Sequence, residues 1–101
     1  MYTLQPDFSK VFTNPDCLKV LRDKLECSFG LIQILLGDFL SDREYEEIKI
    51  TTNFYKQNDL LLEILKEKSN QELNAFLEAL RKTKQGHLAT YIVQEGQSNF
   101  V

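Results

Sequence analysis

The expected fold is centred on one segment, Asn74-Ala75-Phe76-Leu77-Glu78-Ala79-Leu80-Arg81-Lys82-Thr83-Lys84-Gln85-Gly86-His87-Leu88. Its apolar residues, with the preceding leucine, recur at i, i+3, i+4 and i+7, which places them on one face of a helix. The pattern breaks at Gln85-Gly86 and restarts as a short apolar turn. The segment therefore predicts a helix against which other helices pack, followed by a break and a further helix. The residues of the apolar face are Leu73, Phe76, Leu77 and Leu80.

Two sequence signals mark where helices begin on the N-terminal side of this segment. Ser69 is followed three residues later by Glu72, and Ser41 is followed in the same way by Glu44. This spacing is typical of a capping box, in which the serine and the acid bond each other's backbone N–H groups. The first pair starts the central helix. The second starts a short helix that ends around residues 50–52, with Tyr45 and Ile48 facing inward.

The remaining chain also favours helices. Asn14-Pro15-Asp16 is typical of a helix start, and the chain has no proline after it. We expect that helix to end near Ser28. The apolar run Leu31–Leu40 resembles a buried strand or a buried helix. Because no second strand-like run accompanies it, we favour a central helix. Further helices are expected at residues 54–66 and 87–93.

The sequence thus predicts an all-α domain with six helices and short connections, in which helices adjacent in sequence lie antiparallel. We divide the chain into an N-terminal arm at residues 1–13, a helical domain at 14–94 and a polar tail or linker at 95–101. The arm carries apolar residues and is expected to dock on the domain.

Composition limits the function. The 101 residues have 43% hydrophobic and 27% charged content, which is ordinary for a globular domain, and the net charge of −3 argues against a generic nucleic-acid binder. No apolar run reaches the roughly 18 residues of a membrane span, and no secretory signal precedes the domain. On one helix, Cys17 and Cys27 would lie about 15 Å apart along the axis, too far for a disulfide. Reduced thiols favour a cytoplasmic protein.

A catalytic or metal site is not expected. His87 is the single histidine, and we interpret it as a helix-start residue that faces water or bonds the backbone. One histidine and two distant cysteines do not supply a metal site, and no glycine-rich phosphate loop is present. We therefore predict a non-enzyme without a cofactor or metal.

Charge is distributed unevenly. Acids dominate residues 38–49, whereas bases cluster on the first helix and at the end of the central helix. Two interpretations stay open: solvated helix faces, or opposite surfaces that dock copies or relatives head to tail. A helix-turn-helix reader of nucleic acid is a third alternative. It would need an exposed recognition helix rich in Arg, Lys, Asn or Gln.

Three segments resemble a caspase recruitment domain (CARD) of the death-fold superfamily. Phe39-Leu40-Ser41-Asp42-Arg43-Glu44-Tyr45-Glu46-Glu47-Ile48 is similar to the family's entry into its third helix. Leu60-Leu61-Leu62-Glu63-Ile64-Leu65 is similar to the fourth helix. Residues 75–89 resemble the segment from the fifth to the sixth helix, especially that of initiator-caspase prodomains. The likeness covers about Cys17 to Gln94.

Two motifs of the sister families are absent, which favours the same assignment. The chain lacks the Arg-x-Asp-Leu motif of death-effector domains and the tryptophan common in death domains. Family members often have a glycine before the fifth helix, where this chain has Lys68-Ser69-Asn70. The Ser69 cap takes the place of that glycine.

The resemblance implies a six-helix antiparallel Greek-key bundle, often with a kinked first helix. It also implies binding to another CARD-containing protein (a caspase, adaptor or sensor) in cell-death or inflammatory signalling. Self-association into helical filaments is a further expectation, and neither nucleic acid nor membrane is an expected partner. In many family pairs an acidic surface meets a basic one. The matching residues here are Asp38, Asp42, Glu44, Glu46 and Glu47 on the acidic side, and Lys19, Arg22, Lys24 and Lys56 on the basic side. The basic side is interspersed with acids, so we predict that the domain chiefly offers its acidic face to a more basic partner.

Overall fold

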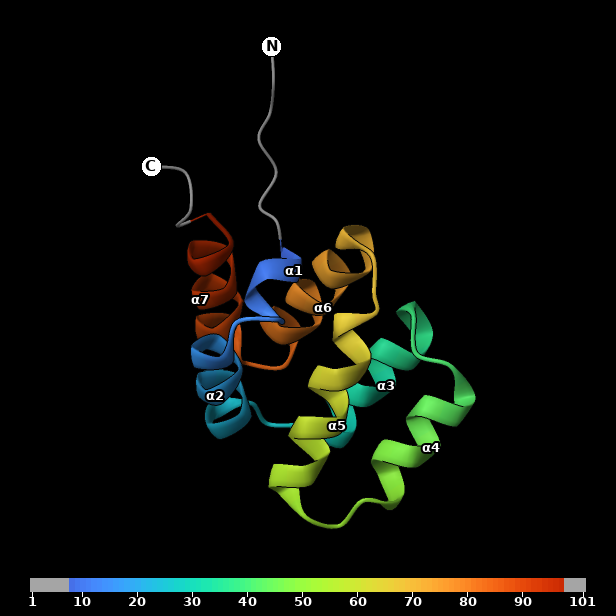
Figure 1. Cartoon of the computed structure of the whole chain (residues 1–101). Coiled ribbons are helices and arrows are strands. Elements are labelled where there is room, and N and C mark those ends of the chain that lie inside the picture. The colour runs from blue at the N-terminus through green and yellow to red at the C-terminus, as the bar shows by residue number, and fades with distance from the viewer. Residues whose placement is uncertain (1–7, 98–101) are drawn as a thin grey trace.

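A computed structural model describes residues 8–97, and within this range the chain is helical with no strands (Figure 1). The all-α prediction is therefore confirmed. The helices are α1 (Phe8–Val11), α2 (Pro15–Lys24), α3 (Phe29–Asp38), α4 (Asp42–Ile50), α5 (Phe54–Lys66), α6 (Asn70–Lys82) and α7 (Gly86–Gln97).

The described residues contain seven helices, one more than the six predicted, because the chain forms a short helix before Pro15. The side chain of Asn14 caps α2 by accepting hydrogen bonds from the backbone N–H groups of Asp16 and Cys17, as the sequence predicts. Proline at the first position of α2 cannot donate to the preceding turn, so α1 and α2 are separate. Together they form the kinked first helix that the resemblance implies, and the bundle then has six helical units.

The α1 helix belongs to the core. Phe8, Val11 and Phe12 are all buried, and the ring of Phe12 meets that of Phe76 edge-on with centroids 6.1 Å apart. The backbone N–H of Phe8 also donates to the side-chain oxygen of Asn70 at the start of α6. The part of the predicted arm at residues 8–13 therefore packs on the domain, while residues 1–7 lie outside the described residues.

The α2 helix ends at Lys24, four residues before the predicted end near Ser28. The cause is a pair of long-range hydrogen bonds. The buried side-chain amide of Asn58 donates to the carbonyl oxygens of Arg22 and Leu25, at 2.9 and 2.7 Å. These carbonyls are satisfied by α5 instead of by a further turn of α2, so Leu25 adopts an extended conformation. Ser28 caps α3 instead, accepting from the N–H of Leu31.

The apolar run at residues 31–40 forms a helix, as favoured over a strand. In α3 the residues Leu31, Ile32 and Leu35 are buried, and this face packs against α6. The helix ends at Asp38, and the buried Leu40 follows it. Because most residues of this helix are apolar, apolar side chains also occupy its outer face. Ile34 and Leu36 there are half-buried.

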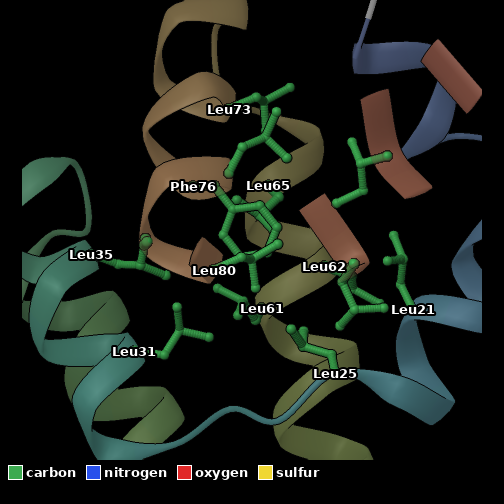
Figure 2. Close-up of a cluster of buried hydrophobic side chains, with 14 of the residues drawn as sticks. Leu21, Leu25, Leu31, Leu35, Leu61, Leu62, Leu65, Leu73, Phe76 and Leu80 are labelled. Atoms are coloured by element: carbon green, nitrogen blue, oxygen red, sulfur yellow. The ribbon is translucent and has the colours of Figure 1, made fainter. Parts of the chain in front are cut away.

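Both capping boxes are present. At Ser41 and Ser69 each hydroxyl accepts from the N–H three residues on, and each glutamate accepts from the serine N–H. The predicted face of α6 is fully buried and lies at the centre of the core, which α2, α3 and α5 complete (Figure 2). Residues drawn in that cluster include Leu21, Leu25, Leu31, Leu35, Leu61, Leu62, Leu65, Leu73, Phe76 and Leu80.

The break between α6 and α7 lies where the sequence placed it. Lys84 has a φ of 65°, the only positive value among the non-glycine residues described. The next helix, α7, continues to Gln97 rather than ending at Val93 as predicted. The buried Ile92 is followed four residues later by the buried Gly96. The inward face of the helix therefore continues past the predicted end. Residues 98–101 of the predicted tail lie outside the described residues.

The contacts between helices determine which helices lie on each side of the bundle. The α6 helix packs on α3, α7 and α1, whereas α5 packs on α2 at one side and on α4 at the other. Figure 1 shows α2 and α4 on opposite flanks of α5. It also shows the start of α1 beside the end of α7, at the end of the bundle away from the connection between α4 and α5.

Candidate protein-interaction surface

The predicted acidic residues lie on α4 and at the end of α3, which pack against each other. Asp42, Glu46 and Glu47 are exposed on α4, and Asp38 is exposed at the last position of α3. Four of the five acids therefore share one solvent-facing region, which we call the acidic surface.

Glu44 differs from the other four acids. Its carboxylate accepts a hydrogen bond from the N–H of Ser41 at 3.0 Å and lies 3.4 Å from the ammonium of Lys68. Burial alone would raise the pKa of Glu44, but the bonds from Ser41 and the charge of Lys68 outweigh it and hold the pKa below its usual value. The charge of Glu44 is thus satisfied within the chain. The principal role of this residue is to cap the start of α4 and to join α4 to the end of α5.

The outer face of α4 also carries an apolar residue that the charge analysis missed. Glu46 and Glu47 precede Ile50 by four and three residues, so all three share one side of the helix. Ile50 is 73% exposed. Arg43 lies on the same side and pairs with Glu47 at 3.4 Å, in an exposed pair that adds little stability. The face is therefore acidic with an apolar residue at its end.

The predicted basic residues lie on α2 and on the first turn of α5. Lys19, Lys24 and Lys56 are exposed, and none of the three forms an ion pair with a residue in the 8–97 range. Lys19 and Lys24 lie on α2, which packs on the flank of α5 opposite α4, and Lys56 lies on the first turn of α5 itself (Figure 1). We call this set, with Arg22, the basic surface.

Arg22 is already engaged within the chain. Its Nε lies 3.2 Å from Asp59, one of its terminal nitrogens donates to the hydroxyl of Tyr55 at 3.2 Å, and its guanidinium carbon lies 5.4 Å from the centre of the Tyr55 ring. This cation–π contact and ion pair hold the start of α5 against the end of α2. Arg22 is therefore chiefly a positioning residue of the basic surface.

A pocket of about 540 Å³ opens beside these residues. Phe54 and Tyr55, at its rim, are 81% and 50% exposed. Sequence reasoning missed it because the segment after α2 was expected to be helical, and its extended course forms one wall. The signal available in the sequence was the pair Phe54-Tyr55, which stands seven residues before the buried Leu61 and Leu62 and so continues the apolar face of α5 into its first turn. The lining residues are Arg22, Asp23, Leu25, Glu26, Cys27, Ser28, Phe54, Tyr55 and Asn58.

The side chains expected to be unsuited to a catalytic or metal site are placed as follows in the part of the chain that the structure describes. His87 is exposed, and no group of three potential metal ligands gathers there. Both cysteines are free. Burial raises the pKa of the Cys27 thiol to about 11, which keeps it protonated and poorly nucleophilic.

The exposed face of α6 has little resemblance to a nucleic-acid recognition helix. Arg81 is paired with Glu78 on that face. In addition, no helix within residues 8–97 is both long and apolar enough to cross a membrane. The described residues thus form a helical bundle that carries an acidic and a basic surface.

A comparison with protein families identifies the family to which the chain belongs. The family model of the caspase recruitment domain matches residues 13–95, so the chain belongs to the CARD family and has its death-fold helical bundle. Domains of this family are homotypic protein-protein interaction modules in signalling, not catalysts. No solved structure matches the chain significantly.

Proposed function

We propose that this CARD recruits or nucleates CARD-containing partners (a caspase, an adaptor or a sensor) in cell-death or inflammatory signalling, and that it acts in the cytoplasm without a cofactor. The observation that carries this proposal is the separation of charge across α5. Exposed acids lie on α4 at one side, and exposed lysines without ion-pair partners among residues 8–97 lie on α2 at the other side and on the first turn of α5.

The acidic surface is the main contact with the partner. The acids Asp38, Asp42, Glu46 and Glu47 outnumber the one base among them, Arg43, whereas the basic surface includes the acids Asp23 and Glu26. Because one exposed ion pair contributes at most about 1 kcal/mol, several pairs must act together. Binding is therefore expected to weaken as salt screens the surface charges.

The test is a charge reversal on the outer face of α4. Glu46→Lys combined with Glu47→Lys should abolish capture of a CARD partner in a pull-down against purified CARD proteins. The melting temperature should change little because both side chains are exposed. A matched control reverses Glu63 and Glu78, which gives the same net charge at exposed sites on α5 and α6 whose ion pairs with Lys66 and Arg81 add little stability. Equal binding by the α4 variant and the wild-type chain would refute the proposal.

Self-association into helical filaments is part of the same proposal. Surfaces of opposite charge on different flanks permit head-to-tail contacts, and these give open assemblies when the rotation does not close a ring. Light scattering and negative-stain microscopy across protein and salt concentration test this. Filaments would identify a self-nucleating domain, and a monomer under all conditions would identify one that depends on a partner.

A further inference from the structure

The pocket beside α5 has the size and the walls of a small-molecule site. Its volume of about 540 Å³ lies within the range that such sites have in proteins. Its apolar and aromatic walls come from Leu25, Cys27, Phe54 and Tyr55. The two aromatic side chains are 81% and 50% exposed, and adjacent exposed aromatic groups beside a hollow are typical of a binding site.

The walls of the pocket are held in place by hydrogen bonds from distant parts of the chain. The side-chain amide of Asn58 donates to the carbonyl oxygens of Arg22 and Leu25. The next residue, Glu26, forms two backbone hydrogen bonds with the side chain of Gln85. The pocket is thus already formed in the single chain, so a ligand that binds there has little of it to order.

Asn58, which lines the pocket, leaves one acceptor unused. The residue is only 5% exposed, and its side-chain oxygen, Oδ1, has no hydrogen-bond partner among residues 8–97. The orientation of the amide follows from its other contacts, because the nitrogen has to face the two carbonyls to which it donates. A buried acceptor without a partner is unfavourable. A ligand that brings an N–H group into the pocket would supply the missing donor.

The charged groups around the pocket favour a cation. The charged residues of its lining are Arg22, Asp23 and Glu26, whereas the lysines of the basic surface lie outside the lining. Arg22 is already paired with Asp59 at 3.2 Å, but neither Asp23 nor Glu26 forms an ion pair in the 8–97 range. Two carboxylates beside aromatic faces attract a positively charged group and repel a negatively charged one.

We propose that this pocket binds a small organic cation that has a flat apolar body and a positively charged N–H group, such as an amidine or an amine. The flat body lies against Phe54 and Tyr55. The N–H group donates to Oδ1 of Asn58, and the positive charge lies near Asp23 and Glu26. This inference goes beyond the proposed function, because the ligand is not a CARD and the outer face of α4 takes no part in its binding.

The test is a nuclear magnetic resonance titration of the whole isotope-labelled chain with three molecules of one shape. Naphthalene-2-carboxamidine is the cation, the matching carboxamide is a neutral donor, and the matching carboxylate is an anion. The amidine should cause saturable shifts of the backbone N–H signals of Cys27, Ser28 and Tyr55, with a dissociation constant of about 1 mM or below. The carboxylate should bind at least about tenfold more weakly than the amidine, with the carboxamide between them.

The side-chain N–H signals of Asn58 report on the unused acceptor itself. An amide whose oxygen accepts a hydrogen bond is polarised, so its N–H signals move. They should move with added amidine at the same dissociation constant as the backbone signals, and they should stay in place with the carboxylate. Asn58 signals that stay in place while the backbone shifts saturate would overturn the proposal.

A charge-neutral rim tests the selection of a cation. Asp23→Asn combined with Glu26→Gln keeps the shape of the rim and should fold, because both side chains are exposed. This variant should bind the amidine about three- to tenfold more weakly and the carboxamide as the wild type does. Glu63→Gln combined with Glu78→Gln removes the same charge outside the lining and should behave like the wild type. Equal binding of the amidine by all three chains, or no saturable shift at the pocket, would contradict the proposal.

An arginine side chain of a partner protein is the competing occupant. N-acetylarginine amide carries the same kind of cation without a flat apolar body, so it should bind at least about tenfold more weakly than the amidine. Equal or tighter binding would rule out a small aromatic cation as the preferred occupant. These results are separate from those of the proposed function, which are measured with a CARD partner and variants of Glu46 and Glu47.

Discussion

Gln85 and Glu26 are joined by two hydrogen bonds across a sequence separation of 59 residues. The Gln85 side-chain oxygen accepts from the N–H of Glu26 at 2.8 Å, and its nitrogen donates to the carbonyl of Glu26 at 2.9 Å. The glutamine is only 3% exposed. One side chain in the break between α6 and α7 thereby satisfies both backbone groups of a residue in the extended segment after α2, and so holds a wall of the pocket in place.

Replacing Gln85 with alanine should therefore destabilise the domain by about 1–3 kcal/mol, because a partly buried N–H and carbonyl lose their partners. Chemical denaturation followed by circular dichroism measures this loss. Gln94 is an exposed glutamine on α7, and Gln94→Ala should change the free energy of unfolding by less than about 0.5 kcal/mol. Equal losses in the two variants would show that the paired hydrogen bonds contribute nothing.

Lys84→Gly should stabilise the fold. Lys84 has a φ of 65°, a conformation that costs a residue with a side chain about 1 kcal/mol and costs glycine little. We expect a gain in unfolding free energy of up to about 1 kcal/mol, measured by urea denaturation. Lys82→Gly is the control, because this lysine lies in the last turn of α6 and glycine there should lower stability. A loss of stability in Lys84→Gly would contradict the expectation.

Phe12→Ala should be among the most destabilising single substitutions, with a loss of about 3–5 kcal/mol. The ring is fully buried and packs edge-on against Phe76, so its removal leaves a cavity between α1 and α6. Phe54→Ala removes the same side chain from a position that is 81% exposed and should cost less than about 1 kcal/mol. Thermal and urea unfolding of both variants measure the contrast, and similar losses would show that α1 is not part of the core.

Stability should fall in acid partly through Glu44. The pKa of Glu44 is lowered in the folded protein, so its contribution is present above the unfolded value of about 4.3 and is lost as the pH falls through the folded value. Melting temperatures between about pH 6 and pH 3 should decline less steeply in Glu44→Gln than in the wild type. Lys68→Met should also flatten the decline, because it removes the ammonium that favours the charged carboxylate. An unchanged decline in both variants would exclude this contribution.

The sequence predicted those parts of the fold that depend on local chemistry. The capping boxes at Ser41 and Ser69, the cap at Asn14 and the apolar face of α6 all follow from side chains within a few residues of one another. The predicted ends of α2 and α7 were wrong because the observed ends depend on residues or burial that local sequence does not reveal. The end of α2 depends on Asn58 and Gln85, which lie far along the chain, and the end of α7 depends on a buried face that continues through Gly96.

The candidate site shows the same division. The acidic residues could be assigned to a common face because α4 is short and its start is clear. Two residues were assigned to surface binding although the structure engages them internally, Glu44 with Lys68 and Arg22 with Tyr55 and Asp59. Those contacts join separate helices, and no spacing in the sequence reveals them. The pocket was missed because it forms only where the end of α2 meets the start of α5.

The packing of α1 against α7 has a practical consequence for any protein that carries this domain. The start of α1 and the end of α7 lie together, while the connection between α4 and α5 lies toward the opposite end of the bundle (Figure 1). A fluorescent protein or affinity tag joined at either end would be directed away from the contacts proposed above. Fusion proteins should therefore report assembly without obstructing it.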